Sequence, residues 1–404
     1  MFLQPQLSIF LLLIFVAIYW SISPDRPNIR TYWLIFSSIM IIGIAAPYAM
    51  LAAIAISLMV WVWLHVFSQI KRMLGDKEIL TCKKYTLSVG ALNSIIFWLA
   101  ICSVILPLLV IDIYERKTTA ATLIITLGIS YVVIKSIGVL IDAYYSRTVY
   151  SIKKILLLNL FFPIYSSGPI EYLSSFEDKV IKRSFSSTFI FQGIGRLALG
   201  LLKTYLIADI LILNNLNAYF FNIDSNPDSY SGIEVILYIL TRFLYVYINF
   251  SGYTDLAIGS ALLFGIKVSE NFNFPIIATN IQNFWTRWHI SLSNFIKNYI
   301  YLRLVVILRR PYIPLFIAFV LVGLWHKIAP GYLLWGIGHG GGLVIYMLLK
   351  KKYASGIIYD KLSRFPVYIF LSWFVTMFYV SLLSFIANSK SLDSAANVLV
   401  QIFK

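Results

Sequence analysis

The chain has 404 residues, of which 60% are hydrophobic and only 12% are charged, and its mean hydropathy is +0.82. Soluble domains carry about 25% charged residues, so this composition excludes a soluble protein and predicts a polytopic membrane protein. The net charge of +16 does not indicate nucleic-acid binding, because the lysines and arginines gather in short loops between apolar runs. The two cysteines, Cys82 and Cys102, offer neither a disulfide framework nor a zinc-ligand spacing.

The N-terminal half contains apolar runs separated by basic loops. The first run is expected to be a span and not a signal peptide, because no basic segment precedes it and no small-residue cleavage site ends it. Lys71–Lys84 carries five cations and is the clearest cytoplasmic loop of this half. With three spans before that loop, the N-terminus is expected outside. The spans expected here are residues 2–20, 32–70 (two spans, broken at Pro47), 89–111 and 120–141.

Residues 155–176 are too short and too interrupted for an ordinary span. Pro163, Gly168 and Pro169 break helices, and exposed backbone at membrane depth is tolerated only inside protein or beside water. We therefore expect a re-entrant or broken helix here. A cytoplasmic loop with an apolar flank is the alternative.

The C-terminal half continues the alternation of spans and loops. Residues 251–266 are expected to form a small-residue helix of their own, suited to close packing, and they carry Asp255. The loop 214–230 has aspartates but no lysine or arginine, so this loop and the C-terminus are expected outside, whereas Lys350–Arg364 is a second cytoplasmic patch. The apolar segments expected in this half are residues 189–213, 232–250, 311–325, 332–349 and 365–386.

Together these segments predict an all-α polytopic membrane protein with about eleven transmembrane helices, plus re-entrant or broken helices around a central passage. No long hydrophilic segment interrupts the spans, so residues 1–404 are expected to form a single integral membrane domain. The protein is expected in a cell membrane, as a multi-pass protein among membrane lipids.

Residues 280–342 form the central stretch of the chain, because three of its four histidines fall there: His289, His326 and His339. Ionisable groups inside a membrane are costly and usually functional. A histidine, with an unperturbed pKa of about 6.5, is the natural proton acceptor near neutral pH. The stretch is therefore interpreted as a catalytic centre held at membrane depth.

The first part of this stretch concentrates polar and aromatic side chains within eleven residues. On one continuous helix, Trp285, His289 and Ser293 would share a face through i,i+4 spacing, and this face would line a water-filled passage. An interfacial amphipathic helix with a tryptophan belt is the alternative. The residues concerned are Asn283, Trp285, Arg287, Trp288, His289, Ser291 and Ser293.

His326 ends an apolar helix in the sequence GLWH, where it can point into a cavity and take a proton from a hydroxyl; a structural histidine is the alternative. His339 lies in WGIGHGGG, whose GxGxxG spacing lacks the strand that a nucleotide-binding loop requires. Gly336 and Gly340 are therefore assigned to tight helix packing. No metal site is expected, because the histidines lack carboxylate or cysteine partners nearby in sequence, and no G-x-S-x-G turn is present.

These residues resemble the membrane-bound O-acyltransferase family. They are similar to its bacterial polysaccharide-modifying branch, which contains alginate O-acetylases and the D-alanyl transferases of teichoic acid synthesis. The resemblance covers a motif core from Gly128 to Gly342 and rests on GISYVVIKSIGVLIDAY, FFPIYSSGPI, FSGYTDLAIG, ENFNFPIIATNIQNFWTRWHISLS, GLWH and WGIGHG.

The resemblance implies that an acyl thioester donor (acetyl-CoA or an acyl carrier) meets a hydroxyl of an extracytoplasmic cell-envelope polysaccharide. It implies no tightly bound cofactor and no metal. His326 matches the essential histidine of the GLWH motif and is the expected general base. Such a base typically raises the reaction rate by about 10²–10⁴-fold. His289 is expected to assist. The expected substrate-binding residues are Asn283, Trp285, Arg287, Trp288 and His339.

Acetyl transfer is the leading hypothesis, and D-alanyl transfer to teichoic acid from a carrier protein is the runner-up. The expected partners are the polysaccharide acceptor and either an acyl carrier protein or a periplasmic acyl-transfer partner, with no nucleic acid. A proton-coupled transporter is the alternative from another class, but the two halves share no repeat. The chain departs from the family at Lys327, where glycine usually follows GLWH, and we expect this lysine to snorkel to the interface.

Overall fold

The computed structural model is helical almost throughout, which confirms the expected all-α class. It describes residues 5–74, 79–82, 85–115, 123–146, 148–180, 185–353 and 365–404. The chain folds into two compact units. The first unit comprises Met1–Leu197 with Leu256–Ser269, and the second comprises Ala198–Asp255 with Glu270–Lys404. The single domain expected over residues 1–404 stays a prediction.

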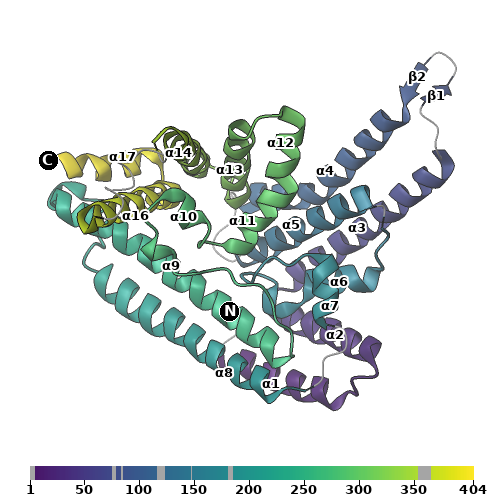
Figure 1. Cartoon of the computed structure of the whole chain (residues 1–404). Helices are drawn as coiled ribbons and strands as arrows, with labels where there is room; N and C mark the ends of the chain where they lie inside the picture. Colours follow the sequence, from purple (N-terminus) through teal and green to yellow (C-terminus); the bar gives the residue numbers. More distant parts are fainter. Residues whose placement is uncertain are drawn as a thin grey trace. The chain divides into compact units, whose positions relative to one another are not determined.

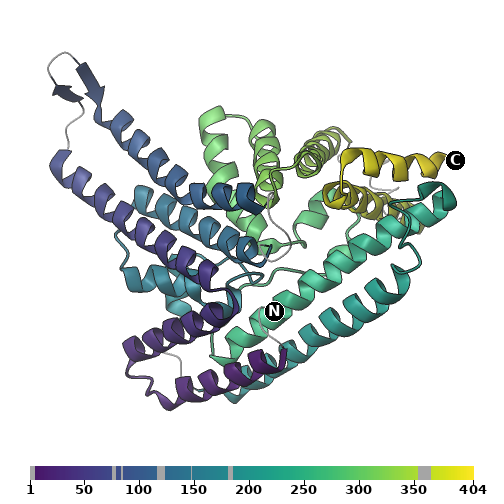
Figure 2. The same cartoon turned by 180° about the vertical axis from the view of Figure 1, so that it is seen from behind.

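The first unit holds the N-terminal helices (Figure 1). Pro47 separates α2 from α3 as predicted, because proline fits the first turn of a helix but cannot continue one. Helices α3, α4 and α5 pack side by side (Figure 2). The elements are α1 (Pro5–Ser21), α2 (Pro27–Ala45), α3 (Pro47–Leu74), β1 (Ile79–Cys82), β2 (Tyr85–Ser88), α4 (Val89–Glu115), α5 (Leu123–Ser146), α6 (Ile152–Leu160), η1 (Phe162–Ile164), α7 (Leu173–Val180) and α8 (Ser187–Leu201), whose last four residues belong to the second unit.

The strands β1 and β2 pair as a short antiparallel hairpin, with Ile79 opposite Ser88. They lie in the loop that the sequence analysis assigned to the cytoplasm. Within the described residues this hairpin is the exception to the helical structure. It does not change the fold class, since each strand has only four residues.

The segment predicted to be re-entrant or broken is indeed broken, into α6, η1 and α7. A buried polar network supports the break. The Lys135 ammonium of α5 donates to the Leu158 carbonyl oxygen at 2.8 Å and to that of Asn159 at 3.4 Å. The Asn159 amide nitrogen donates to the hydroxyls of Ser57 and Ser136, each at 3.0 Å. The network therefore satisfies carbonyls that the end of α6 leaves without helical partners.

The second unit contains the central stretch and the C-terminal helices (Figure 1). One of its apolar cores joins Phe220 and Tyr238 to Phe385 and Val398. Its elements are η2 (Leu202–Leu216), η3 (Pro227–Ser229), α9 (Gly232–Leu263), η4 (Pro275–Ile277), α10 (Ile281–Trp285), α11 (Ile290–Ile296), η5 (Lys297–Tyr301), α12 (Leu302–Leu308), α13 (Tyr312–His326), α14 (Pro330–Tyr353), α16 (Pro366–Asn388), α17 (Leu392–Val400) and η6 (Gln401–Phe403); α9 also supplies Leu256–Leu263 to the first unit.

Helix α9 runs unbroken for 32 residues, so the expected boundary between residues 250 and 251 is wrong. No proline interrupts this stretch, and its polar groups find partners within the second unit. Asp255, 3% exposed, forms an ion pair with Lys203 of η2 at 2.7 Å. A Cβ at Gly252 would collide with the Thr204 hydroxyl. Close packing and a paired carboxylate therefore let the helix continue through a polar sequence.

Helices α13 and α14 form a tight hairpin. A Cβ at Gly336 would lie 2.7 Å from the Phe319 carbonyl oxygen, and one at Gly340 would lie 3.1 Å from that of Phe316. Each distance is shorter than ordinary contact, so glycine permits the close approach of the two helices. The packing role predicted for Gly336 and Gly340 is confirmed.

Eight of the described helices are long and apolar enough to cross a membrane, which confirms a multi-pass membrane protein. The sequence analysis expected about eleven spans. Part of the difference is that α9 joins two expected segments, and another part is that α1 and α13 are shorter, with 17 and 15 residues. The eight are α2, α3, α4, α5, α8 with η2, α9, α14 and α16.

Candidate active site

The candidate site lies in the second unit, where His289 lies between α10 and α11, His326 ends α13 and His339 lies in α14. The Asn280 side-chain oxygen accepts the amide proton of Asn283 at 2.8 Å and starts α10. The helix ends after Trp285. His289 then takes the left-handed conformation, with φ 42° and ψ 55°, and α11 begins at Ile290. The expected continuous helix, with Trp285, His289 and Ser293 on one face, is therefore wrong.

The break at His289 has a physical cause in the ENFNFP segment. The Ile290 amide donates to the Asn271 carbonyl oxygen at 2.9 Å, and the Arg287 carbonyl accepts from the Asn273 amide at 3.0 Å. A continuous helix would use both groups internally. Because a neighbouring chain segment takes them, the helix opens and turns the His289 backbone.

Asn271 is a residue that the sequence analysis did not single out. It is fully buried, and its side-chain oxygen accepts from the Ser291 hydroxyl at 2.5 Å and from the Ser291 amide at 3.4 Å. Its side chain thus caps the start of α11, directly after His289. The motif ENFNFP was visible in the sequence, but its pairing with Ser291 depends on the fold.

Asn283 and Arg287 take part in further hydrogen bonds around the ENFNFP segment and the turn before His289. The Arg287 guanidinium donates to the Asn273 carbonyl oxygen at 3.0 Å and to the Asn283 side-chain oxygen at 3.2 Å. These contacts hold the ENFNFP segment against the turn before His289. Substrate binding by Asn283 and Arg287 stays a prediction beside this positioning role.

Trp288 and His289 pack into an aromatic cluster with α9. The Trp288 ring stacks on Phe243, with ring centroids 5.5 Å apart, and on Phe284 at 5.4 Å. The His289 ring, 2% exposed, meets Phe250 edge-to-face at 5.0 Å. Such aromatic contacts fix ring orientation, so His289 is held in one position beside the chain break.

His339 is held by a tryptophan on each side. The Trp285 indole N–H donates to His339 Nδ1 at 3.2 Å, so Nδ1 is the unprotonated ring nitrogen and Nε2 carries the proton. The Trp335 ring lies 4.4 Å from the His339 ring and 5.4 Å from the ring of His326. Trp335 therefore contacts both histidines. The sequence analysis missed this role, although Trp335 stands four residues before His339 on α14 and so lies on the same helix face.

His326 differs from the other two histidines because its side chain is exposed. It is the last residue of α13, and its ring lies 4.8 Å from Trp325 and 6.0 Å from Tyr332. Among the described residues it has no hydrogen-bond partner, so both ring nitrogens are open to a ligand. The Trp335 ring contacts the rings of both His326 and His339, which brings these two histidines into one site.

Comparison with known proteins decides the family. The sequence profile of the membrane-bound O-acyltransferase family matches residues 31–387. The chain belongs to this family. Membership classes it as an acyltransferase, the enzyme class expected from the sequence.

Relatives of this acyltransferase act on cell-envelope polymers. A teichoic acid D-alanyltransferase of Bacillus subtilis is 29% identical over 64% of this chain and 70% of its own length. A peptidoglycan O-acetyltransferase of Helicobacter pylori is 33% identical over 59% of this chain and 44% of its own length. A probable alginate O-acetylase of Pseudomonas aeruginosa is 30% identical over 58% of this chain and 45% of its own length. The matched stretch thus spans less than half of the two acetyl-transferring relatives.

The acyltransferase holds its candidate residues on separate short elements. His289 lies between α10 and α11, His326 ends α13 and His339 lies inside α14. Within the described residues, no group of three or more His, Cys, Asp or Glu side chains is placed to hold a metal ion. The site can therefore offer an exposed base, His326, beside two buried histidines in aromatic surroundings.

Proposed function

We propose that this acyltransferase moves an acyl group, most simply acetyl, from a thioester donor to a hydroxyl of an extracytoplasmic cell-envelope polysaccharide. His326 is the general base in this proposal. The donor is acetyl-CoA or an acyl carrier, and the chain needs no tightly bound cofactor. The acceptor class follows from the relatives, whose names specify alginate, peptidoglycan and teichoic acid.

In the proposed reaction, a ring nitrogen of His326 takes the proton of the acceptor hydroxyl. The hydroxyl oxygen forms a bond to the thioester carbonyl carbon, the carbon–sulfur bond breaks, and the leaving thiolate receives the proton. An alcohol is a poor nucleophile without such a base. Because the thioester is already activated, a base and good positioning are sufficient.

The exposure of His326 carries the proposal. His289 and His339 are each 2% exposed, whereas the His326 side chain is exposed and has only ring contacts among the described residues. It is thus the histidine that a substrate hydroxyl can reach. Its neighbour Lys327 is exposed too, in keeping with the snorkelling role that we propose for it.

Replacement of His326 tests the proposal. We expect His326→Ala to reduce acyl transfer to envelope polymer by about 10²–10⁴-fold with an unchanged melting temperature. The control is His65→Ala, because His65 on α3 is exposed and its ring contacts the Trp61 carbonyl of the same helix. Full transfer by His326→Ala, measured as polymer-bound acyl groups, would remove His326 as the base.

D-alanyl transfer is a second candidate, favoured by the 70% coverage of the Bacillus subtilis relative. Membranes containing the chain can be supplied with radiolabelled acetyl-CoA or with a D-alanyl carrier protein. Label from acetyl-CoA in the polymer supports the first proposal. Label from the carrier protein alone supports the second.

A further inference from the structure

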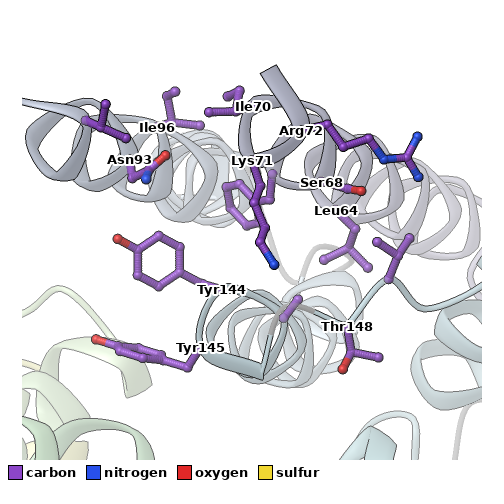
Figure 3. A pocket seen from close by; sticks show the side chains of 14 residues that line it. Leu64, Ser68, Ile70, Lys71, Arg72, Asn93, Ile96, Tyr144, Tyr145 and Thr148 are labelled. Carbon is purple, nitrogen blue, oxygen red and sulfur yellow. The ribbon is translucent and has the colours of Figure 1, made fainter. Parts of the chain in front are cut away.

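The first unit contains a cavity of about 590 Å³, well away in sequence from the three histidines. It lies where α3 and α5 end and α4 begins (Figure 3). Its volume is within the range of small-molecule sites, roughly 300–1,000 Å³. The loop charges predict that this end of the helices faces the cytoplasm.

The polar lining of the cavity favours an anion. Lys71 and Arg72 contribute two positive charges, and the described residues that line the cavity include no carboxylate. Lys71 extends from α3 into the space above α5, whereas the Arg72 guanidinium points outward (Figure 3). Neither cation has an ion-pair partner among the described residues. An anion in the cavity would therefore face the Lys71 ammonium directly.

Uncharged polar side chains add to the lining: Ser68, Asn93, Tyr144, Tyr145 and Thr148. The Tyr144 ring of α5 is held against Phe97, with ring centroids 4.5 Å apart, and against Phe67 at 6.0 Å. Its hydroxyl has no partner within the described part of the chain. A phosphate beside the Lys71 ammonium would accept charge-assisted hydrogen bonds, which are the strong ones.

Part of the wall is apolar. Phe67 and Leu64 stand four and seven residues before Lys71 on α3, so they lie on the same helix face. Leu64 is only 1% exposed, and Ile96 of α4 faces the same cavity. The cavity thus has cations toward the helix ends and hydrocarbon further in. An amphiphile could place its anionic headgroup beside Lys71 and its hydrocarbon against Leu64, Phe67 and Ile96.

The sequence carries further cations after Lys71. The segment joining α3 to α4 contains Lys77, Lys83 and Lys84, so five cations fall within residues 71–84. Clusters of about four to eight lysines and arginines next to a transmembrane helix attract anionic lipid headgroups. We infer that the cavity binds one anionic phospholipid, whose phosphate contacts Lys71 and whose acyl chain lies against Phe67 and Ile96.

Lipid binding to the purified full chain in detergent tests this inference, and it needs no acyl-transfer reaction. Native mass spectrometry would count phosphatidylglycerol or phosphatidylcholine retained by the protein during titration. We expect one tightly bound phosphatidylglycerol, about tenfold weaker binding in Lys71→Gln, and retained binding in Lys71→Arg. The matched control is Lys351→Gln, because Lys351 is an exposed lysine in the last turn of α14.

Three outcomes would overturn the inference. Equal retention of phosphatidylcholine would show a lipid shell without headgroup selection. Equal losses in Lys71→Gln and Lys351→Gln would show a general charge effect. Displacement of the lipid by millimolar inorganic phosphate would show that a soluble phosphate compound is the ligand.

Discussion

Two polar clusters stand out in this apolar protein, and they are built in opposite ways. Around Lys135 in the first unit, the ammonium and the Asn159 amide each donate two hydrogen bonds. In the second unit, His326 has ring contacts but no hydrogen bond within the described residues, and His339 has one, from Trp285.

The contrast separates a structural polar cluster from a functional one. Buried polar groups cost free energy unless they are hydrogen-bonded, and the protein itself supplies acceptors for the Lys135 ammonium and the Asn159 amide nitrogen. A catalytic base must instead keep a nitrogen available for substrate. We therefore expect substitutions in the first cluster to change stability, and substitutions in the second to change the transfer rate.

The largest effect on stability is expected from Lys135→Met, which leaves the Leu158 and Asn159 carbonyls unsatisfied. The free energy of unfolding should fall by about 3 kcal/mol, while the folded fraction keeps its kcat. Thermal unfolding in detergent measures this, with the exposed Lys351→Met as control. A higher melting temperature would mean that the cost of burying the ammonium outweighs its hydrogen bonds.

Gly336→Ala should break the packing that supports the histidine cluster. The new Cβ would lie 2.7 Å from the Phe319 carbonyl oxygen, so α13 and α14 must separate, at a cost of about 2 kcal/mol. Gly341→Ala on the same helix is the matched control, because no atom lies within 4 Å of its Cβ position. It should be neutral or stabilising by up to about 1 kcal/mol. Equal melting temperatures would contradict the packing role.

Asn271→Ala should loosen the start of α11 beside His289. It removes the acceptor of the Ser291 hydroxyl and amide and should destabilise the protein by about 1.5 kcal/mol. Because His289 then loses its fixed turn, kcat should fall more than KM rises. Asn294→Ala, on an exposed position of α11, is the control. A change in KM alone would assign Asn271 to substrate binding.

Trp285→Phe should have a smaller effect, since it keeps a ring in place but removes the indole N–H. Loss of one neutral hydrogen bond to His339 is worth about 1 kcal/mol, or roughly a fivefold drop in transfer rate. The control is Trp98→Phe, at a position 61% exposed. An unchanged rate would show that the orientation of His339 does not matter to the reaction.

The smallest effect is expected at Lys327, which directly follows His326. If this exposed lysine reaches the interface and touches neither substrate, Lys327→Gly changes neither the donor KM nor the pH profile of transfer. A large rise in donor KM, or an acid limb moved by about a unit or more, would make Lys327 part of the site.

The sequence alone determined the helical membrane class, the break at Pro47, the broken segment after residue 155 and the packing glycines of α14. These features depend on composition or on local chemistry. Proline and glycine affect the helical turn in which they stand. A transmembrane segment can be identified from the length of its own apolar run, without knowledge of what it packs against. The motifs also identified the family, because their order and residue types are read without coordinates.

Only the tertiary structure decided how the site is assembled. The turn at His289 exists because Asn271 and Asn273, many residues earlier, take backbone hydrogen bonds that a local pattern assigns to a continuous helix. The position of Trp335 between two histidines and the bonds of Lys135 to α6 likewise join separate elements. Such contacts depend on which segments meet in space, and helical periodicity carries no information about that.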